Sequence, residues 1–245
     1  MDDSSRFPGK DIAEFTPYHV MQFPNLPRTP EPELMDDEEQ ARVYAEADFS
    51  EPHDHFVTLF GLAFPGHEPD GTVLDLGCGP ADVSIRFCRR YGVCRLHGID
   101  GAPAMLRQGH AAVREAGLER RIRLIEGYLP GATLPLPGYA AVISNSLLHH
   151  LADPAVLWAS LRRWGQPGAP VLVMDLLRPA SEVSARELVA LHAADAPDIL
   201  RRDFFHSLLA AYRPEEIRAQ LNAAGLSHLR IAMVSDRHLT VSGWL

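Results

Sequence analysis

Two near-adjacent glycines, Gly77 and Gly79, follow a short apolar run at residues 73–76, and an amphipathic segment at 83–91 comes next. The run is typical of a buried parallel strand, and the glycines are typical of a tight turn into a helix. Because glycine has no Cβ, backbone N–H groups can approach a ligand closely there, and the positive end of the next helix favours an anionic group. Tight turns also use glycine for steric reasons, so the pair indicates a nucleotide-type site only together with other residues.

A carboxylate, Asp100, ends the next strand-like run, 21 positions after Gly79. A carboxylate at this point can accept hydrogen bonds from both hydroxyls of a ribose. The alternative is an N-cap role, because Ala102 and Pro103 suit the start of a helix. Taken with the glycine turn, Asp100 predicts a nucleoside ligand.

The turn departs from the dinucleotide-binding pattern G-x-G-x-x-G/A. Gly77 and Gly79 fill the first two glycine positions, but Asp82 stands at the third. A carboxylate there would crowd the packing of helix against strand and repel a pyrophosphate. We therefore expect a ligand that carries a ribose and lacks phosphates, and a nicotinamide-dependent oxidoreductase is the less favoured alternative.

From residue 72 onward, strand-like runs alternate with helical ones. Repeated βα units predict an α/β fold, a doubly wound parallel sheet with helices on both faces. The expected strands are 73–76, 95–100, 123–126, 139–144 and 171–176, with a closing pair at 229–234 and 238–241, and the expected helices between them are 83–91, 102–116, 154–164 and 214–224.

Helical segments before the first strand and after the fifth interrupt this alternation. Residues 35–70, which precede the main domain (71–245), and an insertion in that domain at about 180–212 are each predicted to hold two helices, and we expect these helices to form a cap. The cap would cover the carboxyl ends of the strands, where open α/β sheets bind ligands. Residues 1–34 are rich in proline and are predicted to form an extended arm, whose apolar residues make it a candidate homodimer contact.

Composition excludes several classes of protein. The chain has 245 residues and a net charge of −9, which argues against nucleic acid as the main partner because phosphate binding relies on clustered Lys and Arg. Cys78, Cys88 and Cys94 lack CxxC spacing and fit reduced thiols better than a disulfide framework or a zinc site. We found no signal peptide and no apolar run of the ~20 residues that a membrane span needs, so we expect a cytoplasmic protein with no membrane partner.

Four motifs together resemble the class I S-adenosylmethionine-dependent methyltransferases. Residues 73–82 resemble the family's first motif, h-h-D-h-G-x-G-x-G, and residues 98–106 resemble its second-strand motif. Residues 139–151 are similar to its fourth strand and following loop, and residues 165–169 to the Pro-Gly turn before its fifth strand. The resemblance implies a Rossmann-like, seven-stranded, mostly parallel sheet that binds S-adenosyl-L-methionine and releases S-adenosyl-L-homocysteine.

The resemblance also implies which residues hold this cofactor. Asp75 and the backbone of the glycine turn would hold the methionine part, and Asp100 would take the ribose hydroxyls. Met105 would pack on the adenine, and the Asn145 region would lie near the methionine amino group. The full set implied is Asp75, Gly77, Cys78, Gly79, Asp100, Gly101, Met105, Gly127, Tyr128, Asn145 and Ser146.

The chain departs from the family pattern at two places. Ala81 replaces the third glycine of the first motif. Residues 126–128, Glu-Gly-Tyr, stand where Gly-Asp often supplies an acid to the adenine amine. Tyr128 could instead stack on the ring or offer its hydroxyl.

Two residues are candidates for catalysis. Methyl transfer from a sulfonium needs little covalent help, because alignment of the nucleophile supplies much of the rate, and a base is needed only if the acceptor must lose a proton. His149 follows the fourth strand and Asp175 ends the fifth, so both face the edge where the sulfonium is expected. His149 would act as a base or orient the acceptor, and the alternative is a positional role in its loop.

An acceptor pocket is expected between this edge and the cap. Its candidate residues are Tyr44, His150, Arg178, Phe205, His206 and Tyr212, for each of which ordinary packing or a surface role is the alternative. His149, His206 and Asp175 could together bind a metal, but nothing in their spacing requires it and no metal is expected. The predicted activity is methyl transfer to a small-molecule acceptor by in-line displacement, and the alternative is a non-catalytic protein that binds S-adenosylmethionine or S-adenosylhomocysteine.

Overall fold

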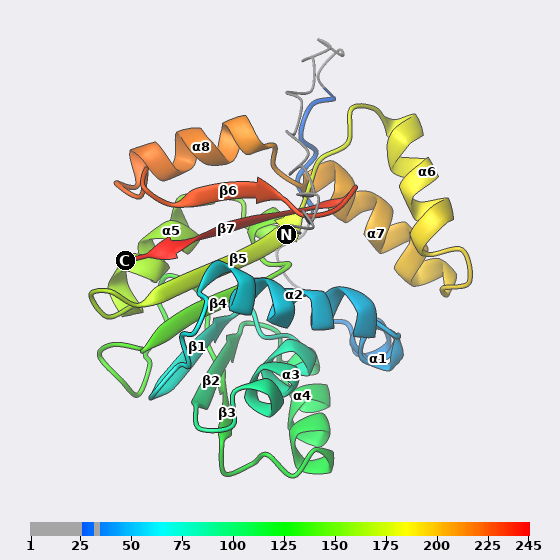
Figure 1. Ribbon diagram of the computed structural model, residues 1–245. Helices are drawn as coiled ribbons and strands as arrows, with labels where there is room; N and C mark the ends of the chain where they lie inside the picture. Colours follow the sequence, from blue (N-terminus) through cyan, green and yellow to red (C-terminus); the bar gives the residue numbers. More distant parts are fainter. Residues whose placement is uncertain (1–25, 32–34) are drawn as a thin grey trace, which may run out of the picture.

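A seven-stranded sheet forms the centre of the molecule in a computed structural model that describes residues 26–31 and 35–245 (Figure 1). The strands are β1 (Thr72–Leu76), β2 (Arg95–Asp100), β3 (Ile122–Glu126), β4 (Ala141–Asn145), β5 (Pro170–Leu176), β6 (Arg230–Met233) and β7 (His238–Trp244). Their order is β3-β2-β1-β4-β5-β7-β6; β1 to β5 run parallel, and β7 pairs antiparallel with β5 and β6. The predicted mostly parallel α/β fold is confirmed.

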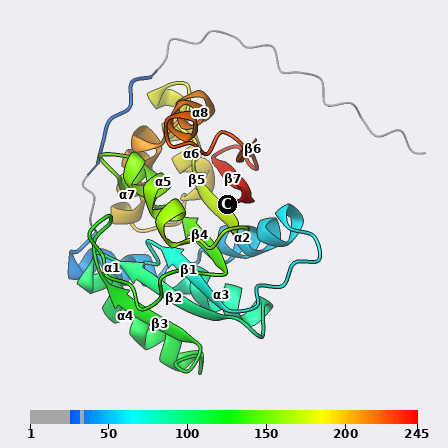
Figure 2. The ribbon, with the colours of Figure 1, turned by 90° about the vertical axis from the view of Figure 1, so that its left-hand side faces the viewer.

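Helices connect the strands and extend beyond them. They are α1 (Glu38–Glu46), α2 (Ser50–Ala63), α3 (Asp82–Arg90), α4 (Pro103–Glu115), α5 (Ala155–Trp164), α6 (Glu182–His192), α7 (Asp198–Ala210) and α8 (Pro214–Ala223), with a 3-10 turn η1 (Leu148–His150) after β4. Helices α2, α3 and α4 pack on one face of the sheet, and α5 and α8 pack on the other (Figure 2).

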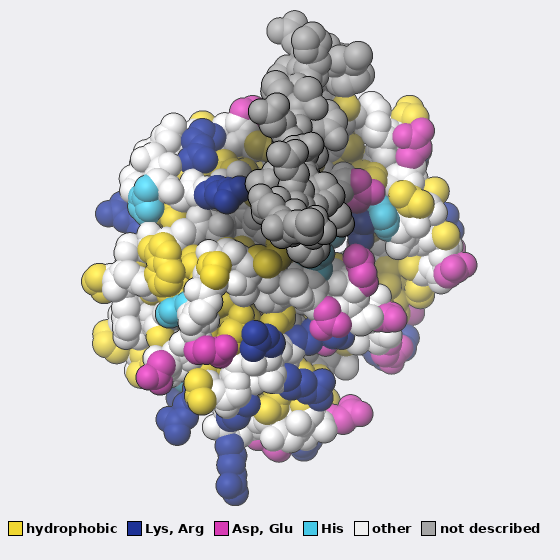
Figure 3. Space-filling view, in the orientation of Figure 1, with side chains coloured by type: hydrophobic (Ala, Val, Ile, Leu, Met, Phe, Trp, Pro, Cys, Tyr) yellow, Lys and Arg dark blue, Asp and Glu magenta, His cyan; other side chains and the backbone are white. Residues whose placement is uncertain are grey.

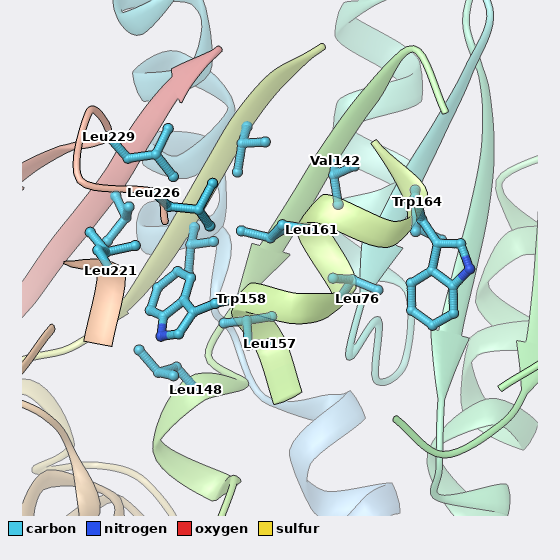
Figure 4. Packing of buried hydrophobic residues seen from close by; sticks show 14 of the residues in the cluster. Leu76, Val142, Leu148, Leu157, Trp158, Leu161, Trp164, Leu221, Leu226 and Leu229 are labelled. Atoms are coloured by element: carbon cyan, nitrogen blue, oxygen red, sulfur yellow. The ribbon is translucent and has the colours of Figure 1, made fainter. Parts of the chain in front are cut away.

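The two layers follow from the alternation of side chains along each strand. In β1, Leu74 and Leu76 join the apolar cluster under α5 and α8, whereas Val73 joins the cluster under α2 and α3. Figure 4 shows Trp158 of α5 among leucines that include Leu148 of η1. Packing on both faces therefore fixes the carboxyl ends of β1, β4 and β5 along one edge.

Helices α1, α6 and α7 lie at this carboxyl edge. Leu177, directly after β5, forms a β-bridge with Tyr212, which follows α7. Gln40 of α1 donates to Asp203 of α7 at 2.6 Å, which links the N-terminal helix to the inserted ones. Figure 1 shows α1, α6 and α7 together at one end of the sheet.

The described part of the predicted arm, residues 26–31, lies against α7 and η1. Arg28 donates from Nε to the Ala210 oxygen at 2.6 Å and from Nη2 to the His149 oxygen at 2.8 Å. Its guanidinium also stacks over the Tyr212 ring, 4.2 Å from the centroid. The rest of the arm, and with it most of the predicted homodimer contact, lies outside the described residues.

The surface mixes charges of both signs. On the face in Figure 3, Lys and Arg side chains lie among Asp and Glu side chains.

All three cysteines are buried and unbridged. In the part of the chain that the structure describes, no helix combines the length and apolar character needed to cross a bilayer.

Candidate functional site

The turn after β1 adopts the left-handed backbone that glycine allows. The φ angle is +70° at Gly77 and +50° at Gly79. A Cβ added to Gly77 would lie 2.8 Å from Leu147 Cδ1, so contact as well as conformation requires glycine there. At Gly79, which lines the cavity, an added Cβ would meet nothing within 4 Å.

The N–H groups of the turn are used within the protein. Gly77 and Cys78 donate to the Ile99 oxygen at 2.9 and 3.0 Å, and Gly79 donates to Asp100 Oδ2 at 2.8 Å. This corrects the expectation that these N–H groups would face an anionic ligand. The site is instead rich in hydrogen-bond acceptors, which suits the ammonium group of an amino acid better than a phosphate.

Asp100 supports the turn and the start of α4 at once. Its Oδ2 accepts from Gly79 and its Oδ1 accepts from the Ala102 N–H at 2.8 Å, so the N-cap alternative is also realised. Burial raises the pKa of Asp100, against the opposing effect of these backbone bonds. Each carboxylate oxygen can accept more than one hydrogen bond. Asp100 can therefore still accept hydrogen bonds from ribose hydroxyls in the cavity that it lines.

Two side chains with buried oxygen atoms lie near the carboxyl ends of β1 and β4. Asp75 is 1% exposed and accepts from Ser84 Oγ at 2.5 Å. Burial raises its pKa to about 7. Asn145 Oδ1 is buried and has no hydrogen-bond partner among the described residues. Since unpaired buried polar atoms are costly, a cation at this point would complete the site.

The two residues expected at the adenine differ in exposure. Met105 is buried and packs with Ala41 and Tyr44 of α1, which places α1 beside the predicted ring position. Tyr128 is 55% exposed and lines the cavity from the loop after β3. An exposed aromatic ring at a cavity wall is available for stacking.

One cavity of about 800 Å³ joins the glycine turn to the helices at the carboxyl edge. Its volume lies within the range of about 300–1,000 Å³ that is usual for ligand pockets. All eleven residues predicted to hold the cofactor line it. Their role stays a prediction, but the sequence motifs bring them to one place.

The two catalytic candidates form a buried pair. His149 Nδ1 lies 2.6 Å from Asp175 Oδ1, and Asp175 Oδ2 accepts from the Leu148 N–H at 2.7 Å. Burial alone would lower the pKa of His149, but the Asp175 carboxylate raises it; the same pairing lowers the pKa of Asp175 against its burial. His149 lines the cavity, whereas Asp175 lies behind it, so only His149 can reach a ligand directly.

Two further contacts were not predicted from the sequence. Glu31 of the arm places Oε1 at 3.4 Å from His149 Nε2. His53 of α2 lines the cavity, and its Nδ1 lies 2.6 Å from Asp82 Oδ2. Asp82 is a carboxylate where the dinucleotide-binding pattern has its third glycine, and this could have suggested that it pairs with another side chain. No local pattern identifies His53 as that partner.

The six predicted pocket residues divide into two groups. Tyr44 and His150 line the cavity. The wall opposite the glycine turn was not predicted in detail and comes from α6, the α6–α7 loop and α7. Its residues include Leu191, Ala193, Ala194, Pro197, Leu200, Asp203, Phe204 and Ser207.

The other four predicted pocket residues lie away from the cavity, which corrects the prediction. Buried Arg178 donates to Glu216 of α8 at 2.6 Å and so points away from the cavity. Tyr212 packs under the arm's guanidinium, and Phe205 lies under a guanidinium of α6. His206 is exposed on α7 and does not line the cavity that His149 lines.

Related sequences belong to methyltransferases. Residues 73–168 match the family model described as a methyltransferase domain. Over 164 residues the chain is 29% identical to an uncharacterized methyltransferase of Mycobacterium tuberculosis (strain ATCC 25618 / H37Rv), covering 66% of this chain and 78% of that protein. It is 30% identical over 115 residues to trans-aconitate 2-methyltransferase of Azoarcus sp. (strain BH72), covering 47% of this chain and 42% of that protein.

Solved structures share the fold. A SAM dependent methyltransferase from Aquifex aeolicus has a TM-score of 0.62 at 18% identity, covering 85% of this chain and 98% of that chain. The plantazolicin methyltransferase BpumL in complex with SAH has a TM-score of 0.62 at 12% identity, covering 84% and 91%. With a matched methyltransferase domain at residues 73–168 and three of the four motifs around one cavity, the comparisons support the resemblance to the class I S-adenosylmethionine-dependent methyltransferases.

Proposed function

We propose that this chain transfers the methyl group of S-adenosylmethionine to a small-molecule acceptor held between the glycine turn and helices α6 and α7. The observation that carries the proposal is the single cavity that runs from the eleven predicted cofactor residues to those helices. S-adenosylmethionine supplies a methyl group already activated by the positive sulfur. The chain's own contribution is to bind, orient and exclude water.

The cofactor end of the cavity is built for a ribose and an amino group. Asp100 would receive the ribose hydroxyls, while the glycine turn that it supports keeps the space beside Gly79 open. The unpaired Asn145 oxygen and the Asp75 carboxylate would receive the amino group. Tyr128 and Met105 would enclose the adenine.

The acceptor end of the cavity combines apolar and polar residues. Leu191, Leu200 and Phe204 contribute aliphatic and aromatic surface from the helices that we propose as a cap. Asp203, Ser207 and His149 provide the polar groups that could orient an acceptor. Burial lowers the pKa of His149 and the Asp175 carboxylate raises it more, and the 2.6 Å contact with Asp175 Oδ1 fixes the ring, which suits a role in orienting the acceptor.

The test is acceptor-dependent formation of S-adenosylhomocysteine. The full chain is incubated with methyl-labelled S-adenosylmethionine and either the small-molecule or the macromolecular fraction of a cell extract. Label should enter the small-molecule fraction. A panel of pure carboxylic acids, phenols and amines then narrows the acceptor, and trans-aconitate belongs in it because one relative carries that name.

The alternatives give different results. A non-catalytic protein would bind S-adenosylhomocysteine in calorimetry but transfer no label to any fraction. A nicotinamide-dependent oxidoreductase would bind NAD and not S-adenosylhomocysteine. Label in protein or RNA alone would overturn the small-molecule acceptor and keep the methyltransferase.

A further inference from the structure

Three potential metal-binding atoms gather where the arm meets the 3-10 turn η1. They are Glu31 Oε1, His149 Nε2 and His150 Nδ1, and all three lie within 4.8 Å of one another. Glu31 Oε1 is 3.4 Å from the His149 atom and 3.3 Å from the His150 atom. Both histidines line the acceptor end of the cavity, and neither belongs to the proposed cofactor set.

These separations are long for hydrogen bonds and suit a shared ion. An N–H···O bond usually spans about 2.7–3.2 Å. Glu31 Oε1 is buried, yet it accepts no hydrogen bond from the described residues. Two ligand atoms bonded at about 2.1 Å to one tetrahedral zinc ion lie about 3.4 Å apart. The observed spacing is therefore close to that of atoms that share a cation.

The orientation of His149 is already set. Asp175 holds its Nδ1 at 2.6 Å and is itself held by the N–H groups of Leu148 and Leu176, both at 2.7 Å. This leaves Nε2 directed at Glu31. Metal-binding histidines characteristically have such a carboxylate on the other ring nitrogen, because it fixes the tautomer and the ring plane.

The position of Glu31 is set by the arm. Arg28 binds the backbone oxygens of Ala210, His149 and Leu151, which fixes the segment three residues before Glu31. Ser207 donates to the other carboxylate oxygen, Glu31 Oε2, at 3.3 Å. The bond from Ser207 orients the carboxylate and leaves Oε1 for the histidines.

We propose that Glu31, His149 and His150 bind a divalent cation of the zinc type, with its remaining coordination position open to the acceptor end of the cavity. Two histidines and one glutamate with an open position form one of the usual ligand sets of catalytic zinc. The open position would take water or an oxygen of the acceptor. This set of ligands differs from the trio of His149, His206 and Asp175 considered from the sequence, for which no metal was expected. The site would bind a cation whether or not the chain transfers methyl groups.

The experiment titrates the chelator-treated full chain with Co²⁺ and with Zn²⁺. Calorimetry gives the stoichiometry, and the visible d–d absorption of Co²⁺ reports its coordination number. We expect one ion per chain and the intense absorption of a four- or five-coordinate site. Asp175→Asn should weaken Co²⁺ binding about 10- to 100-fold, as loss of a supporting carboxylate does elsewhere. Glu31→Gln and His150→Gln, which remove ligands, should weaken it more.

His206→Gln is the matched control, because this exposed histidine of α7 lies outside the cluster. It should bind Co²⁺ like the unmodified chain. Glu31→Gln carries most weight, since it keeps the size of a side chain that lies outside the sheet core. Circular dichroism and S-adenosylhomocysteine binding without metal should be the same for Glu31→Gln as for the unmodified chain.

The inference is overturned if no ion binds at one per chain, if Co²⁺ shows only the weak absorption of a six-coordinate ion, or if Glu31→Gln binds Co²⁺ as tightly as the unmodified chain. These results are independent of methyl transfer. Cofactor binding and label transfer without a cation site would overturn this inference alone. A cation site without label transfer would overturn the proposed function alone.

Discussion

Asp75→Asn should stabilise the unliganded protein at mildly alkaline pH. Burial raises the pKa of Asp75 to about 7 from an ordinary 3.8, even though the bond from Ser84 lowers it. The folded chain therefore keeps a proton that the unfolded chain releases between about pH 4 and pH 7. The contribution of Asp75 to the free energy of unfolding is fully present below about pH 4 and is lost as the pH rises through about 7.

The loss follows from the two pKa values. At 1.36 kcal/mol per pH unit, the gap between 3.8 and about 7 corresponds to at most about 4 kcal/mol of unfolding free energy. Asparagine has nearly the same shape, stays neutral, and can still accept from Ser84. Urea unfolding of the two unliganded proteins should therefore show the advantage of Asp75→Asn growing by up to about 4 kcal/mol from about pH 4 to about pH 8.

The affinity of the unmodified chain for S-adenosylhomocysteine should rise with pH, whereas its stability falls. If ionised Asp75 pairs with the amino group of the cofactor, affinity for S-adenosylhomocysteine should fall about tenfold per pH unit below about pH 7. In Asp75→Asn the affinity should be weaker above pH 7 and independent of pH in this range. Asp70→Asn, on an exposed loop, should change neither property. The reasoning fails if Asp75→Asn is the less stable protein at about pH 8, or if the unmodified chain binds S-adenosylhomocysteine independently of pH.

Three more substitutions test other parts of the site. Asp100→Asn should weaken S-adenosylhomocysteine binding about 10- to 100-fold in calorimetry, because a charged acceptor of ribose hydroxyls is lost; an unchanged Kd would contradict this. Gly77→Ala should lower the unfolding free energy by about 1–3 kcal/mol, because φ is +70° and the new Cβ would contact Leu147. Gly92→Ala is the control; its new Cβ would enter open space, so the unfolding free energy should hardly change in the same denaturation experiment. Arg28→Ala should expose the arm to limited proteolysis, because three bonds to backbone oxygens are lost; equal cleavage rates would contradict this.

The sequence predicted what depends on local pattern. Parallel strands buried on both faces appear as continuous apolar runs, so the order of elements could be deduced, and most of the predicted cofactor residues lie at or just after the ends of such runs. Asp75 and Asp100 reach one cavity because the carboxyl ends of β1 and β2 meet at one edge of the sheet.

Long-range contacts of single polar side chains could not be predicted in this way. Glu31 and His149 are far apart in the sequence, and a proline-rich arm has no periodicity that reveals where it lies. Arg178 follows a strand, as the cofactor residues do, but Glu216 of a later helix draws it away from the cavity. Where a polar side chain points depends on partners that the local sequence does not contain.

The proposed cofactor site can be tested by a crystal structure of the chain with S-adenosylhomocysteine. We expect the ribose hydroxyls within hydrogen-bond distance of Asp100, the amino group at Asp75 and Asn145 Oδ1, and the sulfur facing the part of the cavity bordered by His149 and Phe204. A ligand bound outside this cavity, or with its ribose away from Asp100, would contradict it.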